Sequence, residues 1–219
     1  MSTMNETLEK EEAFYVPSDD TTTANRPKYR AKTAGEYLGH ITKVRTDIRE
    51  WTDKQTGDNY SACIYNFKVL VAPENSRMTY ITNTPNGQET HNGEDYVDWP
   101  IMANGVFRYL EPNKDGTDTF VSHASGNKNY LLFCEAIGVS VETTPREVNG
   151  KTVDVSVIPV LEEKDITGAP VIAVVVRHKK DGHFLDWVND EGKTVPQYRV
   201  KSVEAWTDGK RLATDDLPF

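Results

Sequence analysis

Residues 35–71 have the sequence GEYLGHITKVRTDIREWTDKQTGDNYSACIYNFKVLV, and this stretch decides the fold class. Apolar and polar side chains roughly alternate over residues 37–51 and again over residues 60–71. Alternation with a period of two is typical of a strand that buries one face. The polar residues 52–59 between the two runs include glycine, aspartate and asparagine, which favour a turn. We therefore predict a long β-hairpin with a polar tip.

The rest of the chain indicates further strands and one helix. The alternation slips near Ile48 and Asn66, which indicates bulges and strong curvature in the hairpin. A helix is predicted over residues 127–137, because apolar residues recur there with helical spacing and Gly138 can end it. Further strands are predicted at residues 78–81, within an otherwise irregular stretch 73–98, and at residues 101–110, 153–157 and 170–178, with another hairpin over residues 182–206.

The predicted order is strand, strand, strand, helix, strand, strand, which is the order of the OB-fold. We therefore predict a mostly β fold with one helix, namely an OB-fold-like five-stranded Greek-key barrel with an additional β-hairpin. Residues 1–30 are rich in Thr, Glu, Asp and Asn, and are predicted to form a disordered acidic N-terminal arm. Residues 31–206 would form the folded domain, and residues 207–219 a flexible acidic tail.

The composition of the 219-residue chain, 37% hydrophobic and 27% charged, suits a soluble globular protein. No apolar run approaches the roughly 20 residues that span a bilayer. The first ten residues lack the apolar core of a signal peptide, so we expect a cytoplasmic protein. Cys63 and Cys134 lie far apart in apolar segments, so we expect reduced core thiols, no metal and no cofactor.

The net charge of −9 is concentrated at the two ends of the sequence. Residues 1–20 account for −5 of it, and Asp215 and Asp216 account for −2, so the rest of the chain carries about −2. Because binding follows the local potential, a positively charged groove can exist on a protein that is acidic overall.

Basic and aromatic residues occur together in three places: the first hairpin, the strand at residues 101–110 and the region after residue 176. This mixture is what a protein needs to bind single-stranded nucleic acid, because cations contact phosphates and rings stack on bases. We predict that these residues contact DNA: Arg45, Arg49, Trp51, Lys54, Tyr60, Lys68, Arg108, Tyr109, Arg177, Lys179, Lys180, Phe184 and Trp187.

Other aromatic residues in these segments favour a purely structural interpretation. Tyr65, Phe67, Phe107 and Tyr130 alternate with aliphatic residues or follow the helical spacing, which favours a place in the core. Trp51 lies beside a polar turn, where the two interpretations are equally plausible. The basic residues near residue 178 could simply form a solvated hairpin tip.

The sequence closes on Asp215, Asp216, Leu217, Pro218 and Phe219, which combine two acids with an apolar anchor. This pentapeptide resembles the acidic tip of bacterial and phage single-stranded DNA-binding proteins. The resemblance implies an OB-fold and docking of the tip, through Phe219, onto replication, recombination or repair proteins such as a polymerase, helicase, primase or recombinase. Looser patterns resemble a phage branch of the same family: residues 35–38, the turn at 54–57, the strand from Tyr60, and residues 126–129 entering a helix that ends at Gly138.

The sequence thus predicts a non-catalytic single-stranded DNA-binding protein with no membrane role, which could form a homo-oligomer. It contains no phosphate-binding loop, dinucleotide fingerprint, His-Glu-x-x-His or Gly-x-Ser-x-Gly motif. Two alternatives stay open. One is a metal-dependent nuclease that uses Glu89, Glu94, Asp95 and Asp98. The other is a β-module that binds a protein or a carbohydrate and has no DNA role.

Overall fold

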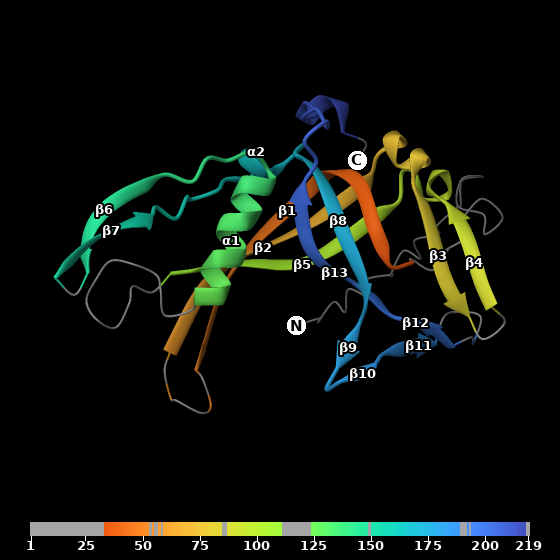
Figure 1. The fold of residues 1–219 in the computed structure, drawn as a ribbon, viewed down its shortest axis with the longest axis horizontal. Helices are drawn as coiled ribbons and strands as arrows, with labels where there is room; N and C mark the ends of the chain where they lie inside the picture. The colour runs from red at the N-terminus through yellow and green to blue at the C-terminus, as the bar shows by residue number, and fades with distance from the viewer. Residues whose placement is uncertain are drawn as a thin grey trace, which may run out of the picture. The chain divides into compact units, whose positions relative to one another are not determined.

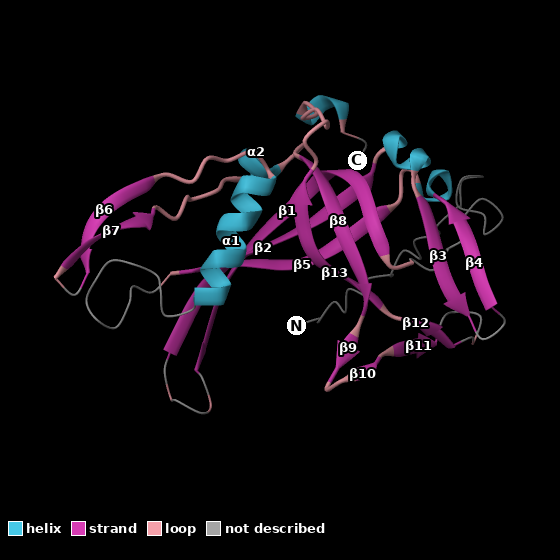
Figure 2. Ribbon diagram, in the orientation of Figure 1, coloured by secondary structure: helices cyan, strands magenta, loops and turns pink. Residues whose placement is uncertain are grey.

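The fold is mostly β (Figure 2), as seen in a computed structural model of the chain. The described residues belong to a compact unit that spans Lys32–Phe219, close to the predicted domain start at residue 31. The predicted N-terminal arm lies outside the described residues. The structure describes residues 33–52, 54, 57, 59–84, 87–110, 124–148, 150–188, 192 and 194–217.

Five strands form the main antiparallel sheet (Figure 1). They are β1 (Gly35–Thr52), β2 (Asn59–Val71), β5 (Pro100–Tyr109), β8 (Pro170–Arg177) and β13 (Tyr198–Ala205). Their order in the sheet is β13-β8-β1-β2-β5. In the described part of the chain, β5 and β13 are the outer strands, and the sheet is not closed by hydrogen bonds between them. The predicted long hairpin is confirmed as β1 and β2, which pair from Gly39–Val71 to Thr52–Asn59.

Three bulges curve the sheet. The register shifts between Ile41 and Lys43 where β1 pairs with β2, between Tyr65 and Phe67 where β2 pairs with β5, and between Val200 and Ser202 where β13 pairs with β8. The shift between Tyr65 and Phe67 lies at Asn66, as the sequence predicts. The shift predicted near Ile48 is wrong, because β1 pairs regularly with β2 throughout that region. The alternation of apolar and polar residues misplaced this bulge because Ile48 is 71% exposed, so no buried face fixes the alternation there.

Four short hairpins form two-stranded sheets that are separate from the main sheet. The sequence predicts β3 in part but misses its partner β4, because the segment that forms β4 is polar and exposed. The hairpins are β3 (Thr79–Thr84) with β4 (Gly87–Asn92), β6 (Thr143–Val148) with β7 (Lys151–Ser156), β9 (Lys179–Lys180) with β10 (His183–Phe184), and β11 (Asp186–Val188) with β12 (Thr194–Pro196).

The strand predicted at residues 153–157 does not belong to the main sheet. It forms β7, which pairs only with β6 among the described strands, and Val153 and Val157 are exposed rather than half-buried. The fifth strand of the sheet is instead β13, which pairs with β8. The alternating valines were misleading because a free-standing hairpin shows the same period of two as a sheet strand.

The predicted helix is confirmed as α1 (Ala124–Ala136), which covers the core. Its Phe133 ring stacks on Phe67 of β2 at 5.2 Å, and its Tyr130 ring stacks on Tyr65 at 5.7 Å. The other helical segments are short: α2 (Glu163–Ile166), η2 (Pro73–Arg77), η3 (Gly93–Tyr96) and η4 (Thr214–Asp216). Among the described helices, none has both the length and the apolar character to cross a membrane.

The core lies between the main sheet, α1 and α2, and its largest buried members are aromatic. Cys134 is fully buried and Cys63 packs against the core, and both thiols are free, as the sequence predicts. Burial raises the pKa of the Cys134 thiol to about 11. The most buried large side chains are Tyr37, Ile41, Tyr65, Phe67, Val69, Val71, Tyr96, Ile101, Tyr130, Ile166, Val171 and Val175.

Residues 206–217, most of which are predicted from the sequence to form a flexible tail, pack against the body of the protein. Trp206 is buried beside His40, and Leu217 is 3% exposed. The Arg211 guanidinium donates to three backbone carbonyls, those of Ile137 at 2.8 Å, Thr167 at 2.9 Å and Asp165 at 3.0 Å. Carbonyls at helix ends lack intrahelical partners, so this arginine caps the ends of α1 and α2 together.

Candidate nucleic-acid interface

Cross-strand pairing gathers four aromatic residues on one face of β1, β2 and β5. Trp51 lies opposite Tyr60, and the pair Ala62–Tyr109 continues the same face. Phe107, two residues before Tyr109, projects to the same side of β5. We call Trp51, Tyr60, Tyr109 and Phe107 the aromatic row.

The rings of the aromatic row follow one another at nearly even spacing. The Trp51 ring lies 5.9 Å from Tyr60 and 5.8 Å from Tyr109, measured between centroids, and Phe107 lies 6.4 Å from Tyr109. Phe107 is 37% exposed, and the other three rings are half-buried. The row therefore offers a continuous aromatic surface whose members hold one another in place.

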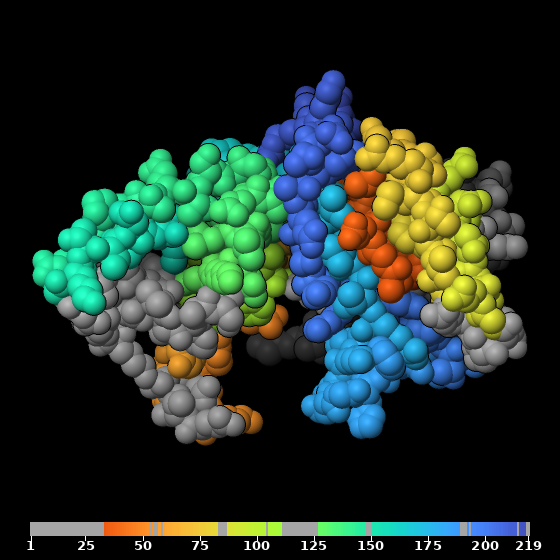
Figure 3. Space-filling model, in the orientation of Figure 1, coloured from red at the N-terminus to blue at the C-terminus, as the bar shows by residue number. Residues whose placement is uncertain are grey.

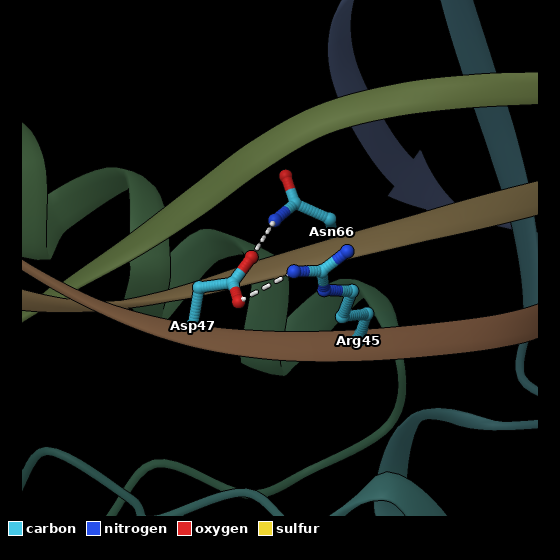
Figure 4. Close-up of polar contacts among 3 residues, drawn as sticks. All are labelled: Arg45, Asp47 and Asn66. Atoms are coloured by element: carbon cyan, nitrogen blue, oxygen red, sulfur yellow. Dashed lines mark hydrogen bonds and ion pairs between the residues drawn. The ribbon is translucent and has the colours of Figure 1, made fainter. Parts of the chain in front are cut away.

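Four cationic side chains lie on the same face as the aromatic row: Lys43, Arg45, Arg49 and Lys68. Arg45 makes an ion pair with Asp47 at 3.2 Å, and the Asn66 amide donates to the other oxygen of the same carboxylate at 3.4 Å (Figure 4). The Arg45 side chain is 77% exposed despite this contact. Among the described residues of β1 from Lys43 to Trp51 and their partners on β2, this face therefore carries four cations against one anion, an excess that favours phosphate.

Lys54 and Arg108, two of the predicted DNA contacts, lie away from this face. Lys54 is exposed in the turn between β1 and β2, beyond the end of the row. Arg108 points to the opposite side of β5, where it pairs with Cys63, and its Nε is shielded from solvent near Tyr65 and Tyr130. Alternation explains the placement of Arg108, because the neighbours of Tyr109 must face the other way.

A second group of predicted contacts lies where β8 continues into β9 and β10. Arg177 ends β8, Lys179 pairs with Phe184 across the hairpin, and Phe184 is 50% exposed. Lys180 lies on the other side of β9, paired with His183. Trp187, in the next hairpin, is 39% exposed.

A groove of about 720 Å³ adjoins the aromatic row. Its walls are β5, α1 and β13, and the latter two lie side by side on the face shown in Figure 3. Phe107 and Tyr109 line one side of it, and Leu132 of α1 and Val203 of β13 line the others. The groove is mainly apolar, so it can accept flat or aliphatic groups next to the row.

Sequence reasoning missed three members of this surface: Lys43, Asn66 and Phe107. The interpretation of Phe107 as a core residue is wrong, because its ring is exposed at the rim of the groove. The signal that identifies all three is strand register, since each lies across from a residue already on the face. The core assignment of Tyr65, Phe67 and Tyr130 is confirmed.

The predicted partner-binding motif is only partly within the described residues. Asp215 and Asp216 are exposed in η4, whereas Leu217 is buried in the protein itself. Pro218 and Phe219 lie outside the described residues.

The acids considered for a nuclease, Glu89, Glu94, Asp95 and Asp98, are exposed on β4, η3 and the turn after it. Within the described residues, no group of three or more His, Cys, Asp or Glu side chains is arranged to hold a metal ion. Comparison of the chain with protein-family models, curated proteins and solved structures finds no match.

Proposed function

We propose that the protein binds single-stranded DNA through the face that carries the aromatic row. The observation that carries the proposal is the line of four adjoining rings flanked by Lys43, Arg45, Arg49 and Lys68. Rings of this kind stack on bases of any sequence, at about 1–3 kcal/mol per base. The cations neutralise phosphates, so binding is expected to weaken steeply as salt is added.

The sheet supports an OB-fold as the architecture behind this function. If its five strands are numbered along the chain, their order in the sheet is 5-4-1-2-3, with α1 between strands 3 and 4. An OB-fold binds oligonucleotides on the face of strands 2 and 3 and with the loops between strands 1 and 2 and between strands 4 and 5. The aromatic row lies on strands 1 to 3, and Arg177–Trp187 leads from strand 4 towards strand 5.

The proposed role is passive and non-catalytic. Bound strand is kept from reannealing and from nucleases. Residues 215, 216, 218 and 219 recruit replication or recombination proteins, while Leu217 stays packed in the protein itself. In this proposal the exposed Asp215 and Asp216 contact basic groups on the partner.

One experiment tests the proposal against both alternatives. A fluorescent oligo-dT is titrated with the full chain at several salt concentrations, with and without magnesium, and the strand is then checked for cleavage. We expect binding whose log–log salt slope is about −0.7 per neutralised phosphate, with intact strand. Magnesium-dependent cleavage would favour the nuclease. Absence of salt-dependent binding would contradict the proposal and favour a β-module without a DNA role.

A further inference from the structure

Two cations contact one aromatic ring of the β9–β10 hairpin, and they come from the end of β8 and from β9. The guanidinium carbon of Arg177 lies 4.5 Å from the centroid of the Phe184 ring, and Lys179 Nζ lies 4.3 Å from it. Lys179 and Phe184 are cross-strand partners, so they share one face of the hairpin. The ring therefore fixes both cations within a short distance of each other on an exposed surface.

Two cations held close together repel each other, and the surrounding residues reduce that repulsion in two ways. The ring quadrupole attracts both charges, at about 0.5–1 kcal/mol for an exposed contact. Asp186 adds an ion pair to Arg177 at 2.8 Å. This ion pair is only partly shielded, since the Arg177 side chain is 37% exposed and that of Asp186 is 40% exposed. A stronger anion can therefore reach the same guanidinium.

We infer that this face of the β9–β10 hairpin binds the phosphodiester backbone of the strand, with Arg177 and Lys179 as the contacting groups and Phe184 as the residue that positions them. The inference rests on the proposed function and deepens it by assigning a role to each side chain. Phe184 does not stack on a base, because its ring already interacts with two cations. Asp186 occupies the Arg177 guanidinium until a phosphate displaces it.

The arrangement favours phosphate over a base for a simple reason. A base that stacked on Phe184 would have to replace a cation at the ring, and that cation would lose its contact with the ring. A phosphate leaves the ring contacts in place and supplies the anion that the two cations share. An acidic peptide offers carboxylates instead, and the experiment distinguishes that case.

The test uses two oligonucleotides of equal length, oligo-dT and an abasic strand that keeps the phosphates but lacks bases. We expect Phe184→Leu, which keeps an apolar side chain but removes the ring, to weaken binding of both strands by the same factor. If Phe184→Leu weakens oligo-dT binding but leaves abasic binding unchanged, the ring is a base-stacking platform and the inference is wrong.

Charge variants give a second, independent readout. Lys179→Ala should reduce the salt slope by about 0.7 and weaken binding about three- to fivefold at physiological salt. Lys180→Ala, on the other face of the hairpin, should have a smaller effect than Lys179→Ala. Lys151→Ala, on the separate β6–β7 hairpin, is the control for loss of one positive charge. Equal effects of Lys179→Ala and Lys151→Ala would overturn the inference.

Removing the negative charge of Asp186 should change DNA affinity in the opposite direction. Asp186→Asn should tighten binding of both strands, because the Arg177 guanidinium no longer has an internal carboxylate. Unchanged or weaker binding would contradict the role assigned to Asp186.

Different results would contradict the inference and the proposed function. If the wild-type chain does not bind oligo-dT, the proposed function is wrong. An acidic peptide is titrated in the same way. If the wild-type chain binds oligo-dT, but Lys179→Ala weakens binding of the acidic peptide and leaves binding of oligo-dT unchanged, the hairpin is a protein-docking site and the inference alone is wrong.

Discussion

Individual side chains on the aromatic face have distinct tasks that follow from their neighbours. Trp51 contacts rings on two strands, Tyr60 on β2 and Tyr109 on β5. It is half-buried, so one part of the indole packs in the row while the rest meets solvent. A side chain placed in this way can add binding energy without being needed for the core.

Trp51→Ala should therefore weaken DNA binding by about 1–3 kcal/mol, since it removes one stacking platform. The unfolding transition should keep its cooperativity and shift only slightly. Oligo-dT titration and thermal unfolding measure the two effects. Ile48→Ala, which removes an exposed side chain from the opposite face of β1, is the matched control. Equal DNA affinity in the Trp51 and Ile48 variants would contradict a role for the row.

A buried polar group attaches the β3–β4 hairpin to β1. The Tyr80 hydroxyl lies 2.8 Å from two acceptors, the backbone carbonyl of Glu36 and the side-chain oxygen of Asn75, and its single proton is shared between them. Asn75 is fully buried and also accepts from the Leu38 amide at 3.1 Å. Burial raises the pKa of Tyr80 to about 12. Ionisation of this phenol would remove the proton that both acceptors share and would leave three oxygen acceptors facing one another.

The raised pKa of Tyr80 predicts a loss of stability in alkali. The folded state holds the phenol proton more tightly than the unfolded state, so the contribution is complete below pH 10 and is lost as the pH rises through about 12. It amounts to about 2–3 kcal/mol. Urea unfolding between pH 9 and 12 should show a shallower decline for Tyr80→Phe than for the wild type. Parallel pH curves would contradict this prediction.

At the residue scale, the sequence predicts the chemistry of the side chains better than their direction. It places Tyr65 and Phe67 in the core correctly, because they share one face of β2 with Val69 and Val71, which are also buried. It fails for Phe107, which has the same local pattern. Whether a face is covered depends on α1 and β13, and these approach β5 only in the folded chain.

At the element scale, the bulge in β5 positions Phe107. Gly105 has a φ of +57°, in the left-handed region that favours glycine. A Cβ there would lie 3.0 Å from Ile64 Cγ2 and 3.1 Å from Phe107 Cε2. The bulge therefore needs glycine both for its backbone conformation and for the close approach of the Phe107 ring.

Gly105→Ala should destabilise the protein by about 1–2 kcal/mol, because it places a side chain in the left-handed region. It should also weaken DNA binding, because the added methyl group displaces Phe107. Urea unfolding and oligo-dT titration measure the two effects. Gly150→Ala is the control, since Gly150 has a φ of +74° but open space around it. If the Gly105 and Gly150 variants bind DNA with equal affinity, the predicted role of Phe107 in DNA binding is contradicted.

Elements that bury one face are the ones that the sequence predicts well. The hairpin of β1 and β2, the strand β8 and the helix α1 all lie within a few residues of their predicted bounds. The strands β4 and β6 are missed because their side chains are mostly exposed and carry no alternating apolar pattern. Their pairing comes from backbone hydrogen bonds to β3 and β7, which composition does not reveal.

At the scale of the whole molecule, the segment from Trp206 to Leu217 holds distant parts together. Arg211 reaches the ends of α1 and α2, and the Leu212 amide donates to the Gly168 carbonyl at 3.0 Å. Gly168 in turn donates to the Ile41 carbonyl at 2.7 Å. None of these contacts is local in sequence, so no pattern in residues 206–217 predicts them.

Arg211→Ala should loosen this segment and lower the free energy of unfolding by about 1–2 kcal/mol, since charged hydrogen bonds to carbonyls are lost from a partly exposed site. Hydrogen exchange should increase at the Leu212 amide. Arg211→Lys keeps the charge but lacks the fork that contacts three carbonyls, so it should recover only part of the loss. Protection at Leu212 equal to that of the wild type would contradict the capping role of Arg211.

The long strand β1 has a consequence for the length of DNA that the protein holds. Its first residue, Gly35, pairs with Val175, close to the cations of the β9–β10 hairpin, whereas Trp51 lies next to its other end. A straight strand of this length would span roughly 55–60 Å, but β1 bends over the sheet, which shortens the direct path (Figure 1). A very short oligonucleotide can contact either the aromatic row or the cations near the β9–β10 hairpin. A longer one that is bound at one of these places can also bind the other, as an intramolecular event. Affinity for DNA should therefore rise in a step as oligonucleotides are lengthened from about 4 to 16 nucleotides. The curvature of β1 sets the oligonucleotide length at which that step occurs.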